Sequence, residues 1–194
     1  MAKQRVNPSK AVRDSLLDEF NHRCAVCGVD RPQVHHIDEN PSNNEPLNLI
    51  PLCPNCHLVD QHNPTAPVDP RKLRLFRVYK DPAILKSQFE PLFSRLLFID
   101  SIQDDQDISE IEERVRELTS FVSTLEMGAF YGKQLEKILK RPQHMYMYGL
   151  YEGPDQQTLA DMRRHAQEYR EQVRQSRNTV YALVVEQLRY QSWK

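Results

Sequence analysis

The feature that most constrains this chain is a pair of Cys-x-x-Cys motifs that together contain all four of its cysteines. The motifs are Cys24/Cys27 and Cys53/Cys56. Each motif can present two thiolates from one tight turn, and two such turns can surround a single zinc ion tetrahedrally, which is the usual geometry of a structural four-cysteine site. We therefore predict a structural Zn²⁺ bound by all four thiolates, with Gly28 allowing the tight backbone after the first motif.

The same stretch carries histidines that a zinc ion saturated by four sulfurs would not use. The doublet His35-His36 lies between the two motifs, and His57 directly follows the last cysteine. In a strand, neighbouring side chains point to opposite faces, so the two members of the doublet are expected to have different roles. An imidazole can take a proton from water near neutral pH or bind a metal ion. The histidines therefore indicate chemistry beside the zinc site.

The order of these residues resembles that of the HNH (ββα-metal) endonucleases in their zinc-knuckle form. The resemblance covers residues 10–62 and rests on the two cysteine motifs and on the segments HHIDENPSNN, NLIPLC and CH. It implies that His36 is the general base, that His35 and His57 bind a catalytic divalent metal, and that Asn48 orients the base by hydrogen bonding the backbone of the intervening loop. The implied reaction is metal-dependent hydrolysis of DNA phosphodiester bonds.

The resemblance leaves open whether a third residue binds the catalytic metal and which ion that metal is. Family members with a third histidine ligand place it four residues after the second, where this chain has Gln61, so that His62, at five residues, is a further candidate ligand. Two protein ligands with open coordination positions favour Mg²⁺ or Mn²⁺, although imidazole also suits Zn²⁺ or Ni²⁺. The neighbouring Asp38 could order a histidine, but we expect it to point into solvent.

The local sequence fits the β, loop, β, α order that the resemblance requires. Residues 9–22 predict a helix with Ser9 as its N-cap, because apolar side chains recur there at helical spacing. Residues 33–37 and 47–52 predict two short strands, separated by a polar loop rich in Asn, Pro and Ser. Residues 54–61 predict a short helix that begins at the second cysteine motif.

Prolines divide the chain into two parts. Residues 63–71 contain three prolines in nine positions, a density that excludes a regular helix or a central strand. We predict an α+β protein, with a small ββα-metal unit and its structural zinc at residues 1–70 and an α-helical region at residues 71–194. In that region an amphipathic stripe is expected to bend or restart at Pro91.

Two apolar stripes with alternating three- and four-residue spacing follow in the helical region. Ser109 and Glu112 are spaced as a capping box at the start of the first stripe. The first stripe contains Ile108, Ile111, Val115, Leu118, Val122 and Leu125, and the second contains Leu159, Met162, Ala166, Tyr169, Val173, Ser176, Val180 and Leu183. Such helices need partners, which an antiparallel bundle within the chain, a homodimer or a partner protein could supply.

Basic residues cluster just after the expected nuclease unit. Arg71, Lys72, Arg74 and Arg77 could form a stripe that follows DNA phosphates, or they could be the solvated face of a helix. The formal net charge of the chain is -1, so the protein as a whole does not have the basic surface that supplies most non-specific affinity for DNA.

We therefore predict a DNA endonuclease of a restriction, phage-defence (antiviral) or mobile-element system. Two other interpretations remain, namely a latent nuclease subunit activated by a partner protein and a non-catalytic zinc module that recruits DNA or protein. No apolar run approaches the ~20 residues that span a bilayer, and the charged start of the sequence lacks the apolar core of a signal peptide. A cytoplasmic protein with reduced cysteines and no membrane contact is expected.

Overall fold

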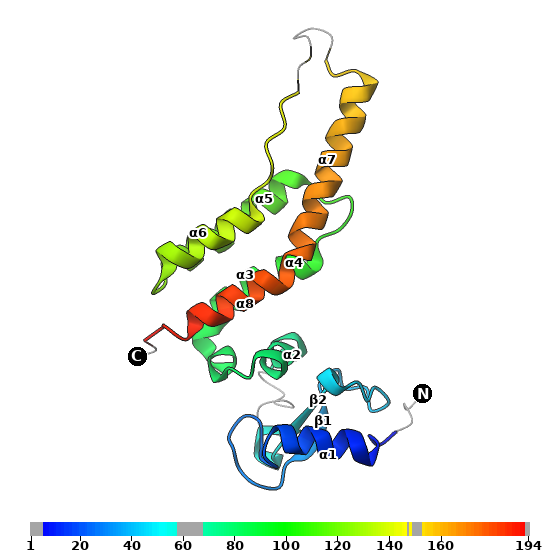
Figure 1. Ribbon diagram of the computed structural model, residues 1–194, viewed down its shortest axis with the longest axis vertical. Coiled ribbons are helices and arrows are strands. Elements are labelled where there is room, and N and C mark those ends of the chain that lie inside the picture. Colours follow the sequence, from blue (N-terminus) through cyan, green and yellow to red (C-terminus); the bar gives the residue numbers. More distant parts are fainter. Residues whose placement is uncertain (1–5, 58–67, 147, 149–152, 193–194) are drawn as a thin grey trace. The chain divides into compact units, whose positions relative to one another are not determined.

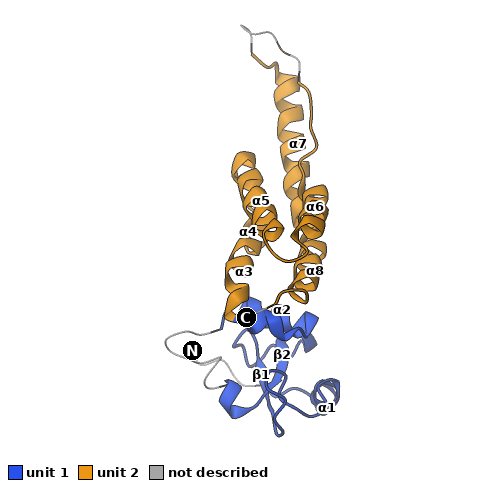
Figure 2. Ribbon diagram, turned by 90° about the vertical axis from the view of Figure 1, so that its left-hand side faces the viewer, with its two compact units in different colours: residues 1–86 blue, residues 87–194 orange. Residues whose placement is uncertain are grey.

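The fold is described from a computed structural model, for residues 6–57, 68–146, 148 and 153–192 (Figure 1). The chain divides into two compact units, residues 1–86 and 87–194 (Figure 2). The described residues form helices and one two-stranded sheet, which confirms the predicted α+β class. The division falls after Lys86, whereas the sequence placed it at residue 70, because helix α2 (Pro70–Tyr79) packs within the first unit.

The first unit begins with helix α1 (Lys10–Glu19). Its N-cap is Ser9, as predicted, whose hydroxyl oxygen accepts a hydrogen bond from the backbone N–H of Val12. The helix ends earlier than expected, because Asn21 and His22 adopt positive φ angles of 52° and 56° that no right-handed helix can contain.

The sheet pairs strands β1 (Gln33–His36) and β2 (Leu49–Leu52) in antiparallel register. A short 3-10 helix, η1 (Pro46–Asn48), occupies the start of the segment that was predicted as strand 47–52. All four residues of β2 are buried, whereas in β1 His35 is buried and the other three residues are partly or fully exposed. The doublet therefore lies on a strand that presents its two histidines to different faces.

Helix α2 is fixed to this sheet by one buried cation. The guanidinium of Arg77, a residue only 4% exposed, donates to the backbone oxygen of Leu49 at 2.8 Å and to both carboxylate oxygens of Glu19 at 2.8 and 2.7 Å. Arg77 thus joins α1, β2 and α2. At the other end of α2, Asp69 is the N-cap and accepts from the backbone N–H of Arg71.

Helices are the regular secondary structure of the second unit in its described residues, joined by irregular segments. The side chains Ile111, Val115, Leu118 and Val122 of the first apolar stripe are buried within the unit. Helix–helix packing inside the chain therefore accounts for this stripe. The principal helices are α3 (Glu90–Leu96), α4 (Phe98–Ser101), α5 (Ile108–Ser123), α6 (Gly128–Leu139), α7 (Gln156–Gln175) and α8 (Arg177–Leu188), and short 3-10 turns lie at η3 (Pro82–Leu85) in the first unit and η4 (Ser87–Phe89) in the second.

Several details of this unit differ from the sequence-based expectation. Asp107, rather than Ser109, caps α5, because its carboxylate accepts from both the backbone N–H and the hydroxyl of Ser109. The second apolar stripe is divided between α7 and α8, which meet at Ser176. Helix α6 was not predicted. Its first residue, Gly128, lies so close to the end of α5 that a Cβ there would overlap the carbonyl of Ser123.

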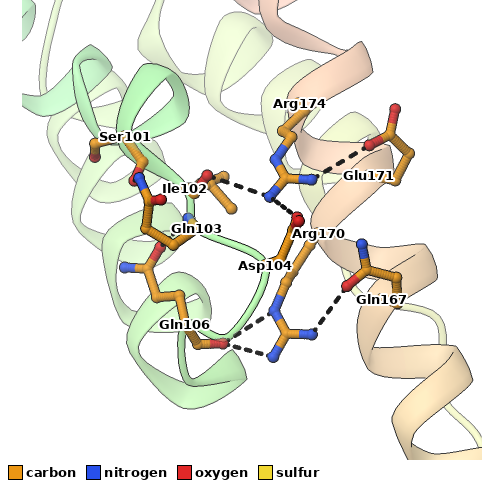
Figure 3. Close-up of polar contacts among 9 residues, drawn as sticks. All are labelled: Ser101, Ile102, Gln103, Asp104, Gln106, Gln167, Arg170, Glu171 and Arg174. Atoms are coloured by element: carbon orange, nitrogen blue, oxygen red, sulfur yellow. Dashed lines mark hydrogen bonds and ion pairs between the residues drawn. The ribbon is translucent and has the colours of Figure 1, made fainter.

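Two arginines of α7 hold the loop that precedes α5 (Figure 3). Arg174 donates to the backbone oxygen of Ile102 at 3.2 Å and to the carboxylate of Asp104 at 2.6 Å. One turn earlier, Arg170 donates twice to the backbone oxygen of Gln106, at 2.7 and 3.0 Å. These contacts satisfy carbonyl groups of an irregular segment, which would otherwise depend on water. Among the described residues, no helix has the length and apolar content that a membrane span requires.

The ion pair between Glu19 and Arg77 gives a test of stability against pH. The hydrogen bond from Arg77 is the largest cause that lowers the pKa of Glu19 below its ordinary value of 4.5. The contribution of the carboxylate is therefore present above that value and is lost as the pH falls through the lower pKa of the folded state. We expect Glu19→Gln to lower the free energy of unfolding at pH 7 by about 1–2 kcal/mol, a figure discounted because Glu19 is partly exposed.

Urea unfolding of wild type and Glu19→Gln between pH 7 and pH 3.5 measures this difference. The two curves should converge as the pH falls from 4.5 through the lower pKa of folded Glu19, because the wild-type carboxyl group is then protonated and uncharged, as the Gln side chain is at every pH. Glu113→Gln, at an exposed position of α5, is the matched control and should follow wild type throughout. A difference in the free energy of unfolding between wild type and Glu19→Gln that stays constant with pH would contradict a stabilising role of the Glu19 charge.

Candidate metal and catalytic centre

The four cysteines come together in one cluster. All four sulfur atoms lie within 4.8 Å of one another, and the sulfurs of Cys27 and Cys53 are 3.6 Å apart. A zinc ion about 2.3 Å from four sulfurs at tetrahedral corners would separate those sulfurs by about 3.8 Å. The thiols are free of disulfides, and three of them are buried while Cys27 is exposed. The cluster can therefore hold a zinc ion, as the spacing predicted.

The first cysteine motif is a tight turn attached to the sheet. The backbone N–H of Gly28 donates to the oxygen of Cys24 at 2.9 Å, and the N–H of Cys24 donates to the oxygen of Val29 at 2.8 Å. Gly28 has a φ of 73°, the left-handed conformation expected of this glycine. The N–H of Ala25 donates to the oxygen of Pro51 in β2. The turn is thus held against the strand that leads into the second motif.

The second motif opens a helical turn at residues 54–57. The backbone N–H of His57 donates to the oxygen of Cys53 at 2.9 Å, and the N–H of Cys56 points to the sulfur of Cys53 at 3.5 Å. Because His57 follows Cys56 directly in this turn, the cluster fixes where the histidine lies. The remainder of the predicted helix 54–61 and the candidate ligand His62 lie outside the described residues.

The environment of the thiols favours one thiolate and opposes others. Burial disfavours the charged form of Cys24, but hydrogen bonds from backbone N–H groups of Cys27 and Cys53 outweigh it and lower its pKa to about 7. Burial, followed by the neighbouring thiols, raises the pKa of Cys56. A divalent cation at the centre would remove this mutual opposition, because it stabilises every thiolate that binds it.

A pair of imidazole rings lies next to the cluster but is separate from it. The ring centroids of His35 and His57 are 4.8 Å apart with an interplanar angle of 77°. Two imidazoles that bind one ion at about 2.1 Å, with a nitrogen–metal–nitrogen angle near 90–110°, have ring centroids about 4.6–5.3 Å apart. His35 is 7% exposed, and 22 residues separate the two histidines in sequence. The two rings are thus in edge-to-face contact, at a spacing that ordinary ring packing also gives and that leaves room for the cation predicted by the resemblance.

The second histidine of the doublet has a different environment. His36 is only partly buried, and its Nε2 lies 3.0 Å from the side-chain oxygen of Asn44 in the loop between the strands. The backbone of His36 pairs with Leu49 of β2, whereas His35 pairs with Ile50. The imidazole expected to act as a base is thus not turned into the interior, and it is held at one nitrogen.

Asn48 organises the loop between the strands from within. This residue is 3% exposed, and its side-chain oxygen accepts from the backbone N–H of Asp38 at 3.1 Å. Its side-chain nitrogen donates to the backbone oxygen of Asn43 at 2.9 Å and to the carboxylate of Asp38 at 2.8 Å. Asn48 therefore makes the loop-backbone hydrogen bonds on which its implied positional role depends.

Asp38 does not point freely into solvent, which corrects the expectation for this residue. Its carboxylate accepts from the side chains of Asn43 and Asn48 and from the backbone N–H of Asn40. Desolvation opposes ionisation of the carboxyl group, but these hydrogen bonds outweigh it and hold the pKa of Asp38 below its ordinary value of 3.8. The carboxylate is a structural centre of the loop, and among the described residues it is not found to accept a hydrogen bond from a histidine.

The basic cluster at the start of α2 does not form a continuous surface. Arg77 is buried against Glu19 and Leu49, and Lys72, 6% exposed, donates to the backbone oxygen of Lys86. Arg71 and Arg74 are exposed, although Arg71 forms an ion pair with Asp69, the N-cap of α2. The predicted stripe of four phosphate contacts is thus reduced to two exposed side chains.

Asn44 contacts the doublet directly but was not among the predicted site residues. The segment around it contains several asparagines, and only the path of the loop decides which of them reaches His36.

Comparisons of the chain with protein-family models, curated proteins and solved structures gave no match. The fold and the site define a mixed α+β protein with a four-cysteine cluster that can hold zinc.

The separation of the cysteine cluster from the ring pair predicts which variants lose zinc. We expect purified protein to contain about one tightly held zinc per chain, the stoichiometry of a closed four-cysteine site. Cys53→Ser should lose this zinc and destabilise the first unit, because metal binding and folding of such sites are coupled. The paired variant His35→Ala/His57→Ala should retain it. Metal analysis of gel-filtered protein measures both, and zinc loss from the histidine variant would show that the imidazoles hold the structural ion.

Proposed function

We propose that this protein is a metal-dependent endonuclease of the HNH type that hydrolyses DNA phosphodiester bonds. The observation that carries the proposal is the ring pair of His35 and His57, at a spacing that suits one shared cation. His36, the residue after His35 in β1, holds a further and separately oriented imidazole. A zinc scaffold without catalytic function needs neither feature.

Four side chains then have defined tasks in the proposed reaction. Hydrolysis of a phosphodiester requires deprotonation of water, neutralisation of charge on the phosphate and stabilisation of the leaving oxygen. Mg²⁺ or Mn²⁺ held by His35 and His57 would supply the electrostatic part when bound. His36 accepts the proton of the attacking water, and Asn48 maintains the loop on which the orientation of His36 depends.

The cysteine cluster acts as the support of this site. Neither β1 nor β2 exceeds four residues, and two strands of that length do not form a stable hairpin alone. Zinc bound by the four thiolates joins the turn before β1 to the turn after β2, and therefore fixes His57 relative to His35. In this proposal, the zinc takes no part in the chemistry.

A latent nuclease is the second candidate, and the burial of Lys72 and Arg77 favours it. These two side chains are occupied inside the first unit, and the net charge of the chain is -1. Affinity for DNA depends mainly on exposed cations. A partner protein that delivers DNA could therefore be required for efficient cleavage, in a restriction, phage-defence or mobile-element system.

Two substrates test the proposal and separate it from the latent form. Wild-type protein with Mg²⁺ or Mn²⁺ should nick supercoiled plasmid and should hydrolyse bis(4-nitrophenyl) phosphate, which needs no DNA affinity. EDTA should abolish both activities, and His36→Ala should lower them by about 10²–10⁴-fold, the usual contribution of a general base. His22→Ala, at an exposed histidine that pairs with Asp18, is the matched control and should remain active.

The pattern of results identifies the function. Hydrolysis of the small diester without plasmid nicking would indicate the latent nuclease. Metal-dependent cleavage that persists in His36→Ala, or the absence of hydrolysis of either substrate at every metal tested, would contradict the proposed endonuclease.

A further inference from the structure

We propose that Asn44, itself oriented by the backbone carbonyl of Val6, is a positioning residue that keeps the neutral imidazole of His36 in its Nε2–H tautomer. The proton-accepting nitrogen of the proposed base is then Nδ1. This inference rests on the proposed function for its catalytic meaning, but its structural content is tested independently of activity.

The side-chain amide of Asn44 is engaged at both ends. Its oxygen lies 3.0 Å from Nε2 of His36, and its nitrogen donates to the backbone oxygen of Val6 at 3.1 Å. Val6 is held in turn, because its own N–H donates to the backbone oxygen of Pro41 in the same loop. The segment before α1 is thereby joined to the loop between the strands through both the N–H and the carbonyl of one residue.

The chemistry of these groups determines where the hydrogen of the imidazole lies. A backbone carbonyl can only accept a hydrogen bond, so the carbonyl of Val6 selects the amide nitrogen of Asn44 and turns the amide oxygen toward His36. That oxygen can also only accept, and the facing Nε2 must therefore carry a hydrogen. A neutral imidazole has one N–H, so its lone pair is left on Nδ1.

Nδ1 is available for this role in the described part of the chain. Within residues 6–57, 68–146, 148 and 153–192, the hydrogen bond to Asn44 is the one found for the side chain of His36. His36 is partly exposed, which leaves a path for water. The opposite tautomer would place a lone pair of Nε2 against the oxygen of Asn44 at hydrogen-bonding distance, which is repulsive.

Asn44 and Asn48 therefore have distinct tasks in one loop. Asn48 is buried and binds the loop backbone at Asp38 and Asn43, with no contact to the imidazole of His36 among its hydrogen bonds. Asn44 reaches the imidazole itself. Loss of Asn48 should disturb the whole loop, whereas loss of Asn44 should release the ring of His36 and the carbonyl of Val6, which stays attached to the loop through its own N–H.

Nuclear magnetic resonance of zinc-loaded protein labelled with ¹⁵N-histidine tests the assignment without substrate. Long-range ¹H–¹⁵N correlation identifies the protonated nitrogen of a neutral imidazole. We expect His36 of wild type to be entirely Nε2–H, with a ring N–H proton that exchanges slowly. In Asn44→Ala the slowly exchanging proton should disappear and both tautomers should be populated. A wild-type His36 in the Nδ1–H form would overturn the proposal.

Kinetics on bis(4-nitrophenyl) phosphate give the second readout. Asn44→Ala should lower kcat by about 10–100-fold with little change in KM, the usual effect of removing a partner that orients a reactive side chain. Asn44→Asp keeps an oxygen that can accept from Nε2–H and should retain the tautomer and recover part of the activity. Glu45→Gln, at the next and exposed side chain, is the matched control and should behave as wild type.

The outcomes distinguish this inference from the proposed function. Equal activity of wild type and Asn44→Ala, with His36→Ala inactive, would overturn the positioning role while the nuclease assignment stands. The expected tautomer in a protein without hydrolytic activity would support the hydrogen bonds from Val6 through Asn44 to His36 and would contradict the proposed nuclease activity. Zinc content and urea unfolding of Asn44→Ala should match wild type, and a large loss of either would overturn a role confined to His36.

Discussion

The arrangement of the first unit depends on bringing four thiols from two distant turns into one cluster. The turn at Cys24 and the turn at Cys53 flank a hairpin too small to be stable by its own packing. When four thiolates share one zinc, the free energy of metal binding becomes free energy of folding. His57 directly follows the last cysteine, so the same cluster determines how far its ring lies from that of His35.

Polar side chains, rather than apolar packing, determine the rest of the candidate site. Asp38 and Asn48 form the centre of the loop between the strands, and Asn44 extends from that loop to His36. These groups satisfy backbone amides that an irregular segment would otherwise leave to water. A loop built in this way can hold a side chain in one orientation while the site remains open to solvent, which suits the hydrolysis that we propose.

Short-range patterns in the sequence were sufficient for part of this description. The cysteine spacing gave the cluster, and Ser9 marked the start of α1, because both depend on neighbouring residues. The role of Arg77 could not be predicted, because its partners Glu19 and Leu49 are distant in sequence and a basic residue on a helix ordinarily faces water. Helix α6 was missed for a similar reason, since it begins at glycine, a poor helix former that close packing against α5 requires.

The central claim is that a divalent cation binds between His35 and His57 while zinc occupies the thiolates. Titration of Mn²⁺ into zinc-loaded, ¹⁵N-histidine-labelled protein tests it most directly, because a paramagnetic ion broadens the resonances of the rings that bind it. Our account predicts saturable broadening of His35 and His57 at unchanged zinc content, with His22 and His144 unaffected. Resonances of His35 and His57 that stay sharp at saturating Mn²⁺, or equal broadening of all histidines, would contradict it.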